Sequence, residues 1–134
     1  MKKLGFKNYF FIGIGGIGMS SLARYLKLKE KNVSGYDLNQ SKITNQLNDL
    51  EIKIIHREQI DLIEKIYLNV EDTLIIYTPA IQSDNILYKY FIENNFKIIK
   101  RSDLLQLITH DKVTIAVSGT HGKTTVTSLL TNIF

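Results

Sequence analysis

The chain has 134 residues, no cysteine and a formal net charge of +4, and 44% of its residues are hydrophobic and 22% charged. This is the composition of a globular protein with room for a single domain of ordinary size. The absence of cysteine excludes disulfides and thiolate metal sites. No apolar run approaches the ~20 residues of a membrane helix, no signal-peptide pattern follows Met1, and the lysines form no dense basic run. We therefore expect a cytoplasmic protein that binds neither membranes nor nucleic acid.

Strands and helices are predicted to alternate along the chain. Apolar runs predict strands, and apolar residues spaced by three and four predict amphipathic helices. The expected strands are 8–12, 33–36, 52–55, 73–78 and 97–100, and the expected helices are 16–29, 41–50, 58–68, 84–95 and 103–109. Because this order contains no hairpin signal, it predicts an α/β fold with a Rossmann-like, doubly wound parallel sheet.

Some side chains have predicted roles within these elements. Helix caps are expected at Ser41, at Asp84 or Asn85, and at Ser102, because short polar side chains accept hydrogen bonds from the first helical turn. Asn32 is expected to stop the first helix. Apolar spacing places Ile17, Leu22, Ala23 and Leu26 on the sheet side of the first helix, Leu50 in the buried stripe of the second, and Tyr88 and Phe91 in the core.

A glycine cluster joins the first strand to the first helix. Gly13, Gly15 and Gly18 form the pattern G-x-G-x-x-G between an apolar run at 9–12 and the helical pattern. In a strand-turn-helix setting these glycines allow a tight turn, close backbone approach to a diphosphate, and close packing of the helix on the sheet. The free N–H groups of the first helical turn then face an anion. The cluster predicts a phosphate-cradling turn, and the alternative is a purely structural βα turn.

Two further residues follow predicted strand ends. Asp37 lies about 20 residues beyond the glycine cluster, where dinucleotide-binding proteins place an acid for ribose hydroxyls. Its place beside the glycine turn favours a ligand role over that of a turn residue. Arg101 could equally contact a phosphate or carboxylate or form a surface ion pair.

A second glycine-rich loop lies near the end of the sequence. The β-branched run at 113–117 predicts a strand, residues 118–125 are SGTHGKTT, and an apolar-periodic helix is expected over 126–133. In such a unit, backbone N–H groups hold phosphates, the lysine meets the β/γ oxygens and a hydroxyl meets Mg²⁺. The spacing departs from G-x-x-x-x-G-K-[ST], because Val117 stands five positions before Gly122. The loop nevertheless predicts a triphosphate site.

Together the two loops resemble those of the Mur ligase family. The segment 119–125, GTHGKTT, is similar to the family's ATP loop, and 11–20, FIGIGGIGMS, is similar to the opening turn of its alanine-adding members. Residues 78–85, TPAIQSDN, and 100–105, KRSDLL, agree as well. The resemblance covers nearly all of this chain but only the first part of the family's three-domain architecture. It implies a UDP-sugar-binding N-terminal domain at 1–109 and, at 110–134, the first βα unit of the central P-loop ATPase domain.

The resemblance also implies a reaction and its contacts. L-alanine is joined to the carboxylate of UDP-N-acetylmuramate through an acyl phosphate, with ATP and Mg²⁺ required. Lys123 and Thr124 are implied to be catalytic, and Thr124 also to bind the metal. The residues implied to bind ATP are Gly119, Thr120, His121, Gly122, Lys123, Thr124 and Thr125, and those implied to bind the UDP-sugar are Gly13, Gly15, Gly16, Ile17, Gly18, Asp37, Thr78, Ala80, Asn85 and Arg101. One departure is Leu50-Glu51, where relatives commonly place a glycine after the helix.

Other interpretations stay open at this point. The glycine turn with Asp37 would also suit an NAD(P)-dependent oxidoreductase, although that class has no need of a γ-phosphate site. A non-catalytic nucleotide-binding module is a second alternative, and within the family the ligase that recycles a whole murein peptide is a third. His121 suits a substrate contact and a backbone contact equally, whereas His56 and His110 lack partners at metal-ligand spacing and are expected to be structural or exposed. No sequence feature indicates an oligomeric state.

Overall fold

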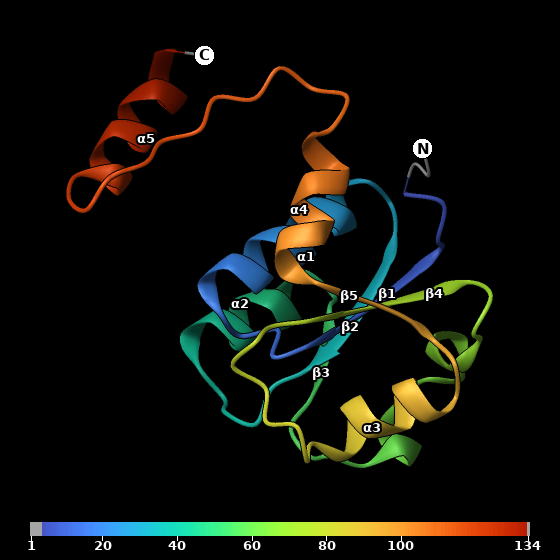
Figure 1. The fold of residues 1–134 in the computed structure, drawn as a ribbon. Coiled ribbons are helices and arrows are strands. Elements are labelled where there is room, and N and C mark those ends of the chain that lie inside the picture. The colour runs from blue at the N-terminus through green and yellow to red at the C-terminus, as the bar shows by residue number, and fades with distance from the viewer. Residues whose placement is uncertain (1–3, 134) are drawn as a thin grey trace.

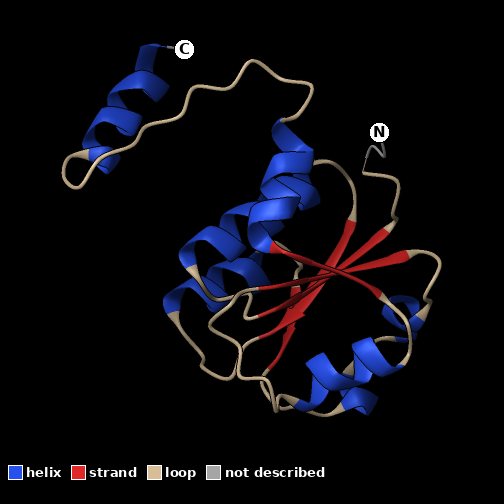
Figure 2. Ribbon diagram, viewed as in Figure 1, coloured by secondary structure: helices blue, strands red, loops and turns tan. Residues whose placement is uncertain are grey.

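One parallel sheet organises the structure, a computed structural model that describes residues 4–133. Its strands are β1 (Asn8–Ile12), β2 (Asn32–Tyr36), β3 (Lys53–Ile55), β4 (Thr73–Tyr77) and β5 (Lys97–Lys100). They pair in the order β3-β2-β1-β4-β5, and every pair is parallel. Figure 2 shows these strands in red, gathered into one sheet. The predicted α/β fold with a doubly wound parallel sheet is confirmed.

Helices cover both faces of this sheet (Figure 1). On one face lie α1 (Ile17–Leu28), α2 (Lys42–Asp49) and α4 (Arg101–Thr109), and on the other lie α3 (Ile86–Glu93) and the 3₁₀ turns η1 (Ile60–Leu62) and η2 (Lys65–Leu68). A last helix, α5 (Lys123–Ile133), stands apart from the sheet at the end of an extended segment (Figure 1). None of the helices within residues 4–133 has both the length and the apolar character needed to cross a membrane.

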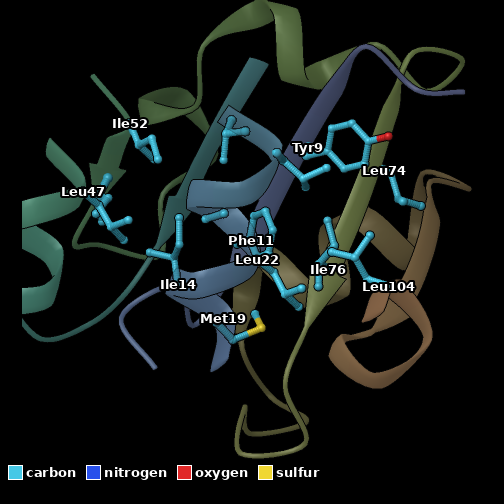
Figure 3. Close-up of a cluster of buried hydrophobic side chains, with 14 residues drawn as sticks. Tyr9, Phe11, Ile14, Met19, Leu22, Leu47, Ile52, Leu74, Ile76 and Leu104 are labelled. Atoms are coloured by element: carbon cyan, nitrogen blue, oxygen red, sulfur yellow. The ribbon is translucent and has the colours of Figure 1, made fainter. Parts of the chain in front are cut away.

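Strand β1 lies at the centre of two separate cores. All five of its residues are buried, and because side chains alternate along a strand, Tyr9 and Phe11 enter one core while Phe10 and Ile12 enter the other. Figure 3 shows the first core, where Phe11 and Ile76 of the sheet meet side chains of α1, α2 and α4 such as Leu22, Leu47 and Leu104. A strand that is covered on both faces is expected to be apolar over most of its length, and the polar residue of β1 is Asn8 at its start.

The second core is largely aromatic. The ring of Phe91 on α3 lies 5.4 Å from that of Phe10 and 4.9 Å from that of Phe96, in tilted and edge-on arrangements that aromatic pairs favour. The ring of Tyr88, also on α3, lies 5.1 Å from that of Tyr77 at a tilt of 52°. The prediction that Phe91 belongs to the core is confirmed, and Tyr88 is half-buried and packs against that core.

Two of the three predicted helix caps are present. Ser41 Oγ accepts a hydrogen bond from Thr44 N at 3.2 Å, while Thr44 Oγ1 accepts one from Ser41 N at 2.8 Å. Asn85 caps α3 by accepting from Tyr88 N at 3.0 Å. The cap predicted at Ser102 is wrong, because Asp103 reaches back to Lys100 N at 3.3 Å and α4 begins at Arg101.

The helices α1, α2 and α3 are each followed by a residue with left-handed backbone conformation. Glu30, Glu51 and Asn95 have φ of 58°, 60° and 60°, each just after the C-cap of α1, α2 or α3. This is the position that glycine usually fills. Asn32 was wrongly predicted to stop α1, since Glu30 makes the turn and Asn32 opens β2. Leu50 was wrongly placed in the buried stripe of α2, because as the C-cap it is 45% exposed.

The helix predicted over 58–68 is absent. Ile63 and Glu64 have extended backbone, with ψ of 129° and 139°, and separate η1 from η2. The apolar residues that suggested a helix were Ile60, Ile63 and Ile66 or Tyr67, and of these Ile63 lies in the extended break between the two turns. Ile63 and Tyr67 are buried against the aromatic core, whereas Ile66 is 48% exposed.

The strand predicted at 113–117 is also absent. These residues are extended but pair with none of the five strands, and Val113 is 101% and Ile115 56% exposed. A strand is stabilised by hydrogen bonds to a neighbouring strand, and the described residues offer none there. The following helix forms but begins at Lys123 instead of 126.

Candidate functional site

A cavity of about 640 Å³ opens at the carboxyl edge of the sheet. It lies at the switch point between β1 and β4, whose connections run to opposite faces, and such crevices are where open α/β sheets bind ligands. The volume is typical of a small-molecule site. Its walls are Gly13, Gly16, Ile17, Gly18, Met19, Tyr36, Asp37, Leu38, Asn39, Glu58, Thr78, Ala80, Ile81, Gln82, Asn85 and Arg101.

The glycine turn forms one wall of this cavity. Gly13 has φ of +88°, which favours glycine, and its N–H donates to Tyr36 O at 2.7 Å. Gly16 is the N-cap of α1 and supplies no capping side chain, and the first turn of the helix has no acidic residue. The N-terminal N–H groups of α1 and their partial positive charge are thus presented beside the cavity.

Asp37 is fixed next to this turn by backbone donors. Its Oδ2 accepts from Gly15 N at 2.7 Å and its Oδ1 from Asn39 N at 3.0 Å. His56 Nδ1 lies 2.6 Å from the carbonyl oxygen of Asp37, which confirms a structural role for this histidine. Gly15 itself does not line the cavity, since it lies against the carboxylate. Each carboxylate oxygen keeps a lone pair for a further donor such as a hydroxyl.

Arg101 lies over the first turn of α1. Its Nη1 would be 1.9 Å from a Cβ on Gly18, so the missing side chain of Gly18 provides the space for the guanidinium. The motif predicts that Gly18 allows close packing of the helix on the sheet, but the near neighbour of this glycine is the arginine. Arg101 belongs to none of the ion pairs found among residues 4–133. The cavity therefore has a cationic end formed by a helix N-terminus and a guanidinium.

The opposite wall is the loop between β4 and α3. Thr78 follows β4, and its Cγ2 would be 3.0 Å from a Cβ on Gly13, so the two walls meet closely at this point. Two turns shape the loop, with Ile81 N donating to Thr78 O at 3.0 Å and Asn85 N donating to Gln82 O at 3.1 Å. Asn85 lines the cavity while its side chain caps α3.

Ile17 departs from its predicted packing. Expected on the sheet side of α1, it is 79% exposed at the start of the helix, where it borders the cavity. The first helical residue lies beyond the edge of the sheet, which explains why it has no sheet to face. Leu38 is 67% exposed at the same cavity. The rim of the cavity is therefore partly apolar.

The lining residues that the sequence did not predict are Met19, Tyr36, Leu38, Asn39, Glu58, Ile81 and Gln82. Most adjoin a residue that was predicted, so their position after a strand end could have identified them. Glu58 has no such neighbour, and its Oε1 accepts from the Tyr36 hydroxyl at 3.2 Å. Burial of Tyr36 and the nearby Glu58 charge raise the pKa of the Tyr36 hydroxyl to about 12.

The second glycine-rich loop is exposed and lies away from the sheet (Figure 1), and none of its residues lines the cavity. Gly119 and Gly122 have φ of +150° and +74°, which other residues rarely adopt. Nothing lies within 4 Å of the position that a Cβ on Gly122 would take. Lys123 is the first residue of α5, with Thr124 and Thr125 next to it. The structure does not bring this loop to the cavity, and His110, as expected, is exposed, beside Asp111.

The family profile described as Mur ligase family, catalytic domain, matches residues 8–113. The chain belongs to the Mur ligase family. The matched region holds the whole sheet, the cavity and α4.

Curated relatives extend this similarity into the second loop. A UDP-N-acetylmuramate–L-alanine ligase of Flavobacterium psychrophilum is 50% identical over 126 residues, which are 94% of this chain and 28% of the relative. The chain thus spans little more than a quarter of the length of such Mur ligases.

Solved Mur ligase structures share the fold. The UDP-N-acetylmuramate-alanine ligase of Thermotoga maritima matches with a TM-score of 0.82 at 30% identity, covering 94% of this chain and 28% of that one. A ligase for L-alanyl-gamma-D-glutamyl-meso-diaminopimelate from Neisseria meningitides matches with a TM-score of 0.79 at 24% identity, covering 93% of this chain and 38% of that one. The second likeness concerns the fold alone.

Proposed function

We propose that this chain is the nucleotide-sugar-binding part of an ATP-dependent ligase that joins L-alanine to UDP-N-acetylmuramate. The observation that supports this most is the cavity at the β1–β4 switch point, which has a cationic end beside the glycine turn and an acid at Asp37. Relatives that are 50% and 46% identical bear the name of that alanine ligase. The murein-peptide ligase stays the alternative within the family.

The UDP-sugar is proposed to lie along this cavity with its diphosphate at the N-terminus of α1. Arg101 would pair with the phosphate charge and the α1 amides would donate to it, since both are positive and face the cavity. Asp37 would accept from ribose hydroxyls. The remaining proposed contacts come from the same walls, at Gly13, Gly16, Ile17, Gly18, Thr78, Ala80 and Asn85. Gly15 would take part through its hydrogen bond to Asp37.

The second loop is proposed to bind the phosphates of ATP. Its fit rests on two positive-φ glycines, on open space at Gly122, and on an 11-residue helix that begins at Lys123. Backbone N–H groups at 119–122, together with Thr120, His121 and Thr125, would surround the phosphates, Lys123 would attract the transferring phosphoryl group, and the Thr124 hydroxyl would hold Mg²⁺. The metal would neutralise charge on the phosphates when bound.

In the proposed reaction the nucleophiles belong to the substrates. The muramyl carboxylate attacks the γ-phosphorus of ATP, giving an acyl phosphate and ADP. The amine of L-alanine then attacks the acyl carbon, loses a proton and releases phosphate as the amide forms. The chain's own residues would bind and orient the reactants, and Lys123 would stabilise charge in the first step.

This proposal includes a division of labour along the chain. Residues 1–109 would form the UDP-sugar domain, and residues 110–134 would begin the ATPase domain. Because ATP and nucleotide sugars are made inside cells, we place the reaction in the cytoplasm. An NAD(P)-dependent oxidoreductase would leave the lysine loop without a role.

Phosphate release by the complete ligase tests this function. We expect release to require UDP-N-acetylmuramate, ATP and L-alanine together, and residues 1–134 alone to release none. An enzyme that reduces NAD and releases no phosphate would contradict the proposal. Full activity with a murein tripeptide in place of L-alanine would contradict it as well.

A further inference from the structure

Glu58 takes no part in the contacts proposed above, yet both of its carboxylate oxygens are engaged at the cavity. Oε2 accepts from Ile86 N at 2.8 Å, across 28 residues of chain. Oε1 accepts from the Tyr36 hydroxyl at 3.2 Å, across 22 residues. One side chain therefore links two segments that are distant in sequence.

The Tyr36 end of this link belongs to the wall that holds Asp37. Tyr36 is the last residue of β2 and directly precedes Asp37, and the residue is only 3% exposed. Its carbonyl oxygen accepts from Gly13 N at 2.7 Å and Ile14 N at 3.0 Å. Tyr36 is thus attached both to the glycine turn and to the acid beside it.

The Ile86 end belongs to the opposite wall. Ile86 is the first residue of α3 and ends the lining loop at 78–85, whose own hydrogen bonds are two short turns. A carboxylate at a helix N-terminus is stabilised by the free amides there. Asn85 satisfies Tyr88 N, and Glu58 satisfies Ile86 N, so the two side chains cap different amides.

The surroundings of Glu58 differ from those of an ordinary surface carboxylate. Among residues 4–133 no lysine, arginine or histidine forms an ion pair with it. Its partners are a buried hydroxyl and a backbone amide, both of which have fixed positions. Such hydrogen bonds hold a geometry better than a flexible ion pair does.

We propose that Glu58 is a positioning residue that ties the Asp37 wall to the 78–85 wall and so sets the width of the cavity. This inference rests on the proposed UDP-sugar site. Without the link, the 78–85 loop is free to move away from the glycine turn, and the bound sugar nucleotide loses the contacts of one wall.

Three variants of the 134-residue chain test this role. Glu58→Ala removes the link. Glu58→Gln keeps it, because the amide oxygen accepts from Ile86 N while its NH₂ donates to the Tyr36 hydroxyl. Glu64→Ala is the matched control, since Glu64 pairs with Lys53 at 3.1 Å on the surface and lines no part of the cavity.

Calorimetric titration with UDP-N-acetylmuramate and amide hydrogen exchange give the two readouts. We expect Glu58→Ala to raise the Kd about tenfold and to speed exchange at Ile86 and in the 78–85 loop. Glu58→Gln should stay within about threefold of the unaltered chain, and Glu64→Ala should match it in both readouts. Rescue by glutamine is what separates positioning from a direct charge contact with the ligand.

Unchanged affinity and exchange in Glu58→Ala would overturn the proposal, and so would a Glu58→Gln chain as impaired as Glu58→Ala. If the unaltered chain binds no UDP-N-acetylmuramate, the proposed function fails, while exchange at Ile86 still decides whether Glu58 fixes the loop. If Glu58→Ala does not fold, Tyr36→Phe replaces it, because this change removes the hydroxyl that donates to Glu58. If amide exchange in the 78–85 loop of Tyr36→Phe equals that of the unaltered chain, the link is contradicted.

Discussion

A Cβ atom on Gly18 would lie 1.9 Å from Nη1 of Arg101 and 3.0 Å from its Cζ. The guanidinium of Arg101, which follows β5, therefore occupies the space that a side chain on Gly18, in the first turn of α1, would take. The conflict that a methyl group would cause falls on the far end of a flexible side chain, which can move away at little cost. A substitution at Gly18 should harm the site more than the fold.

The first prediction concerns this pair. Gly18→Ala should displace the guanidinium and raise the Kd for UDP-N-acetylmuramate about tenfold, and Arg101→Ala should raise it by about 10- to 100-fold, as expected for a hydrogen bond to a charged group. The double variant should be no worse than Arg101→Ala, because both changes remove one interaction. Calorimetry measures the Kd of all three variants, and Arg24→Ala is the control. Arg24 lies on α1, donates a hydrogen bond to Gln46 and does not line the cavity. Additive losses would contradict the pairing.

The second prediction concerns the end of α2. Glu51 has φ of 60°, a conformation that costs a residue with a side chain about 1–2 kcal/mol. Glu51→Gly should therefore raise the free energy of unfolding by about 1 kcal/mol, measured by urea denaturation. Asp49→Gly, at the last residue of the same helix, should lower the free energy of unfolding by a few tenths to about 1 kcal/mol. If Glu51→Gly lowers the free energy of unfolding, the Glu51 side chain makes a contact that stabilises the fold by more than the backbone strain costs.

The third prediction concerns alkaline pH. Burial raises the pKa of Tyr9 to about 12, and burial together with the Glu58 charge raises that of Tyr36 to about 12. The folded chain keeps these protons at a pH where the unfolded chain, with a tyrosine pKa near 10, loses them. The stabilisation is thus complete below pH 10 and is lost between about pH 10 and 12. Tyr36→Phe should flatten this decline in denaturation midpoints, and an unaltered slope would contradict the burial argument.

The fourth prediction concerns Lys123 in the complete ligase. An ammonium at the start of α5 should attract the transferring phosphoryl oxygens most strongly as their charge grows. Lys123→Ala should lower the turnover rate by roughly two to four orders of magnitude, with UDP-sugar affinity unchanged because that ligand occupies the other cavity. Lys123→Arg should not restore the rate, since the guanidinium is larger and planar. Steady-state kinetics and calorimetry on each variant give the comparison, and near-normal turnover would show that the two loops are wrongly assigned.

The sheet and most of the cavity could be predicted from sequence because local patterns determine them. Apolar runs identified the strands, and parallel pairing brings every strand's carboxyl end to one edge, so Gly13, Asp37, Thr78 and Arg101 had to meet there. No structure-wide information was needed for that step. The same holds for Ser41 and Asn85, whose caps depend only on the next few residues.

The remaining features depend on contacts across the fold. Whether 58–68 forms an α-helix depends on how Ile63 and Tyr67 meet the aromatic core, and whether 113–117 forms a strand depends on a neighbouring strand. Two contacts join residues that are far apart in sequence. They are the hydrogen bond from Ile86 N to Glu58 and the contact of Arg101 with Gly18. Periodicity contains no information on such pairs.

Titration of the 134-residue chain with UDP-N-acetylmuramate and, separately, with NAD tests the central claim most directly. We expect saturable binding of the UDP-sugar and none of NAD. A Cβ on Gly15 would lie 2.6 Å from Asp37 Oδ2, so Gly15→Val should abolish UDP-sugar binding, whereas Arg24→Ala should leave it intact. Tighter binding of NAD than of UDP-N-acetylmuramate, or undiminished UDP-sugar binding by a folded Gly15→Val chain, would contradict the assignment of this cavity.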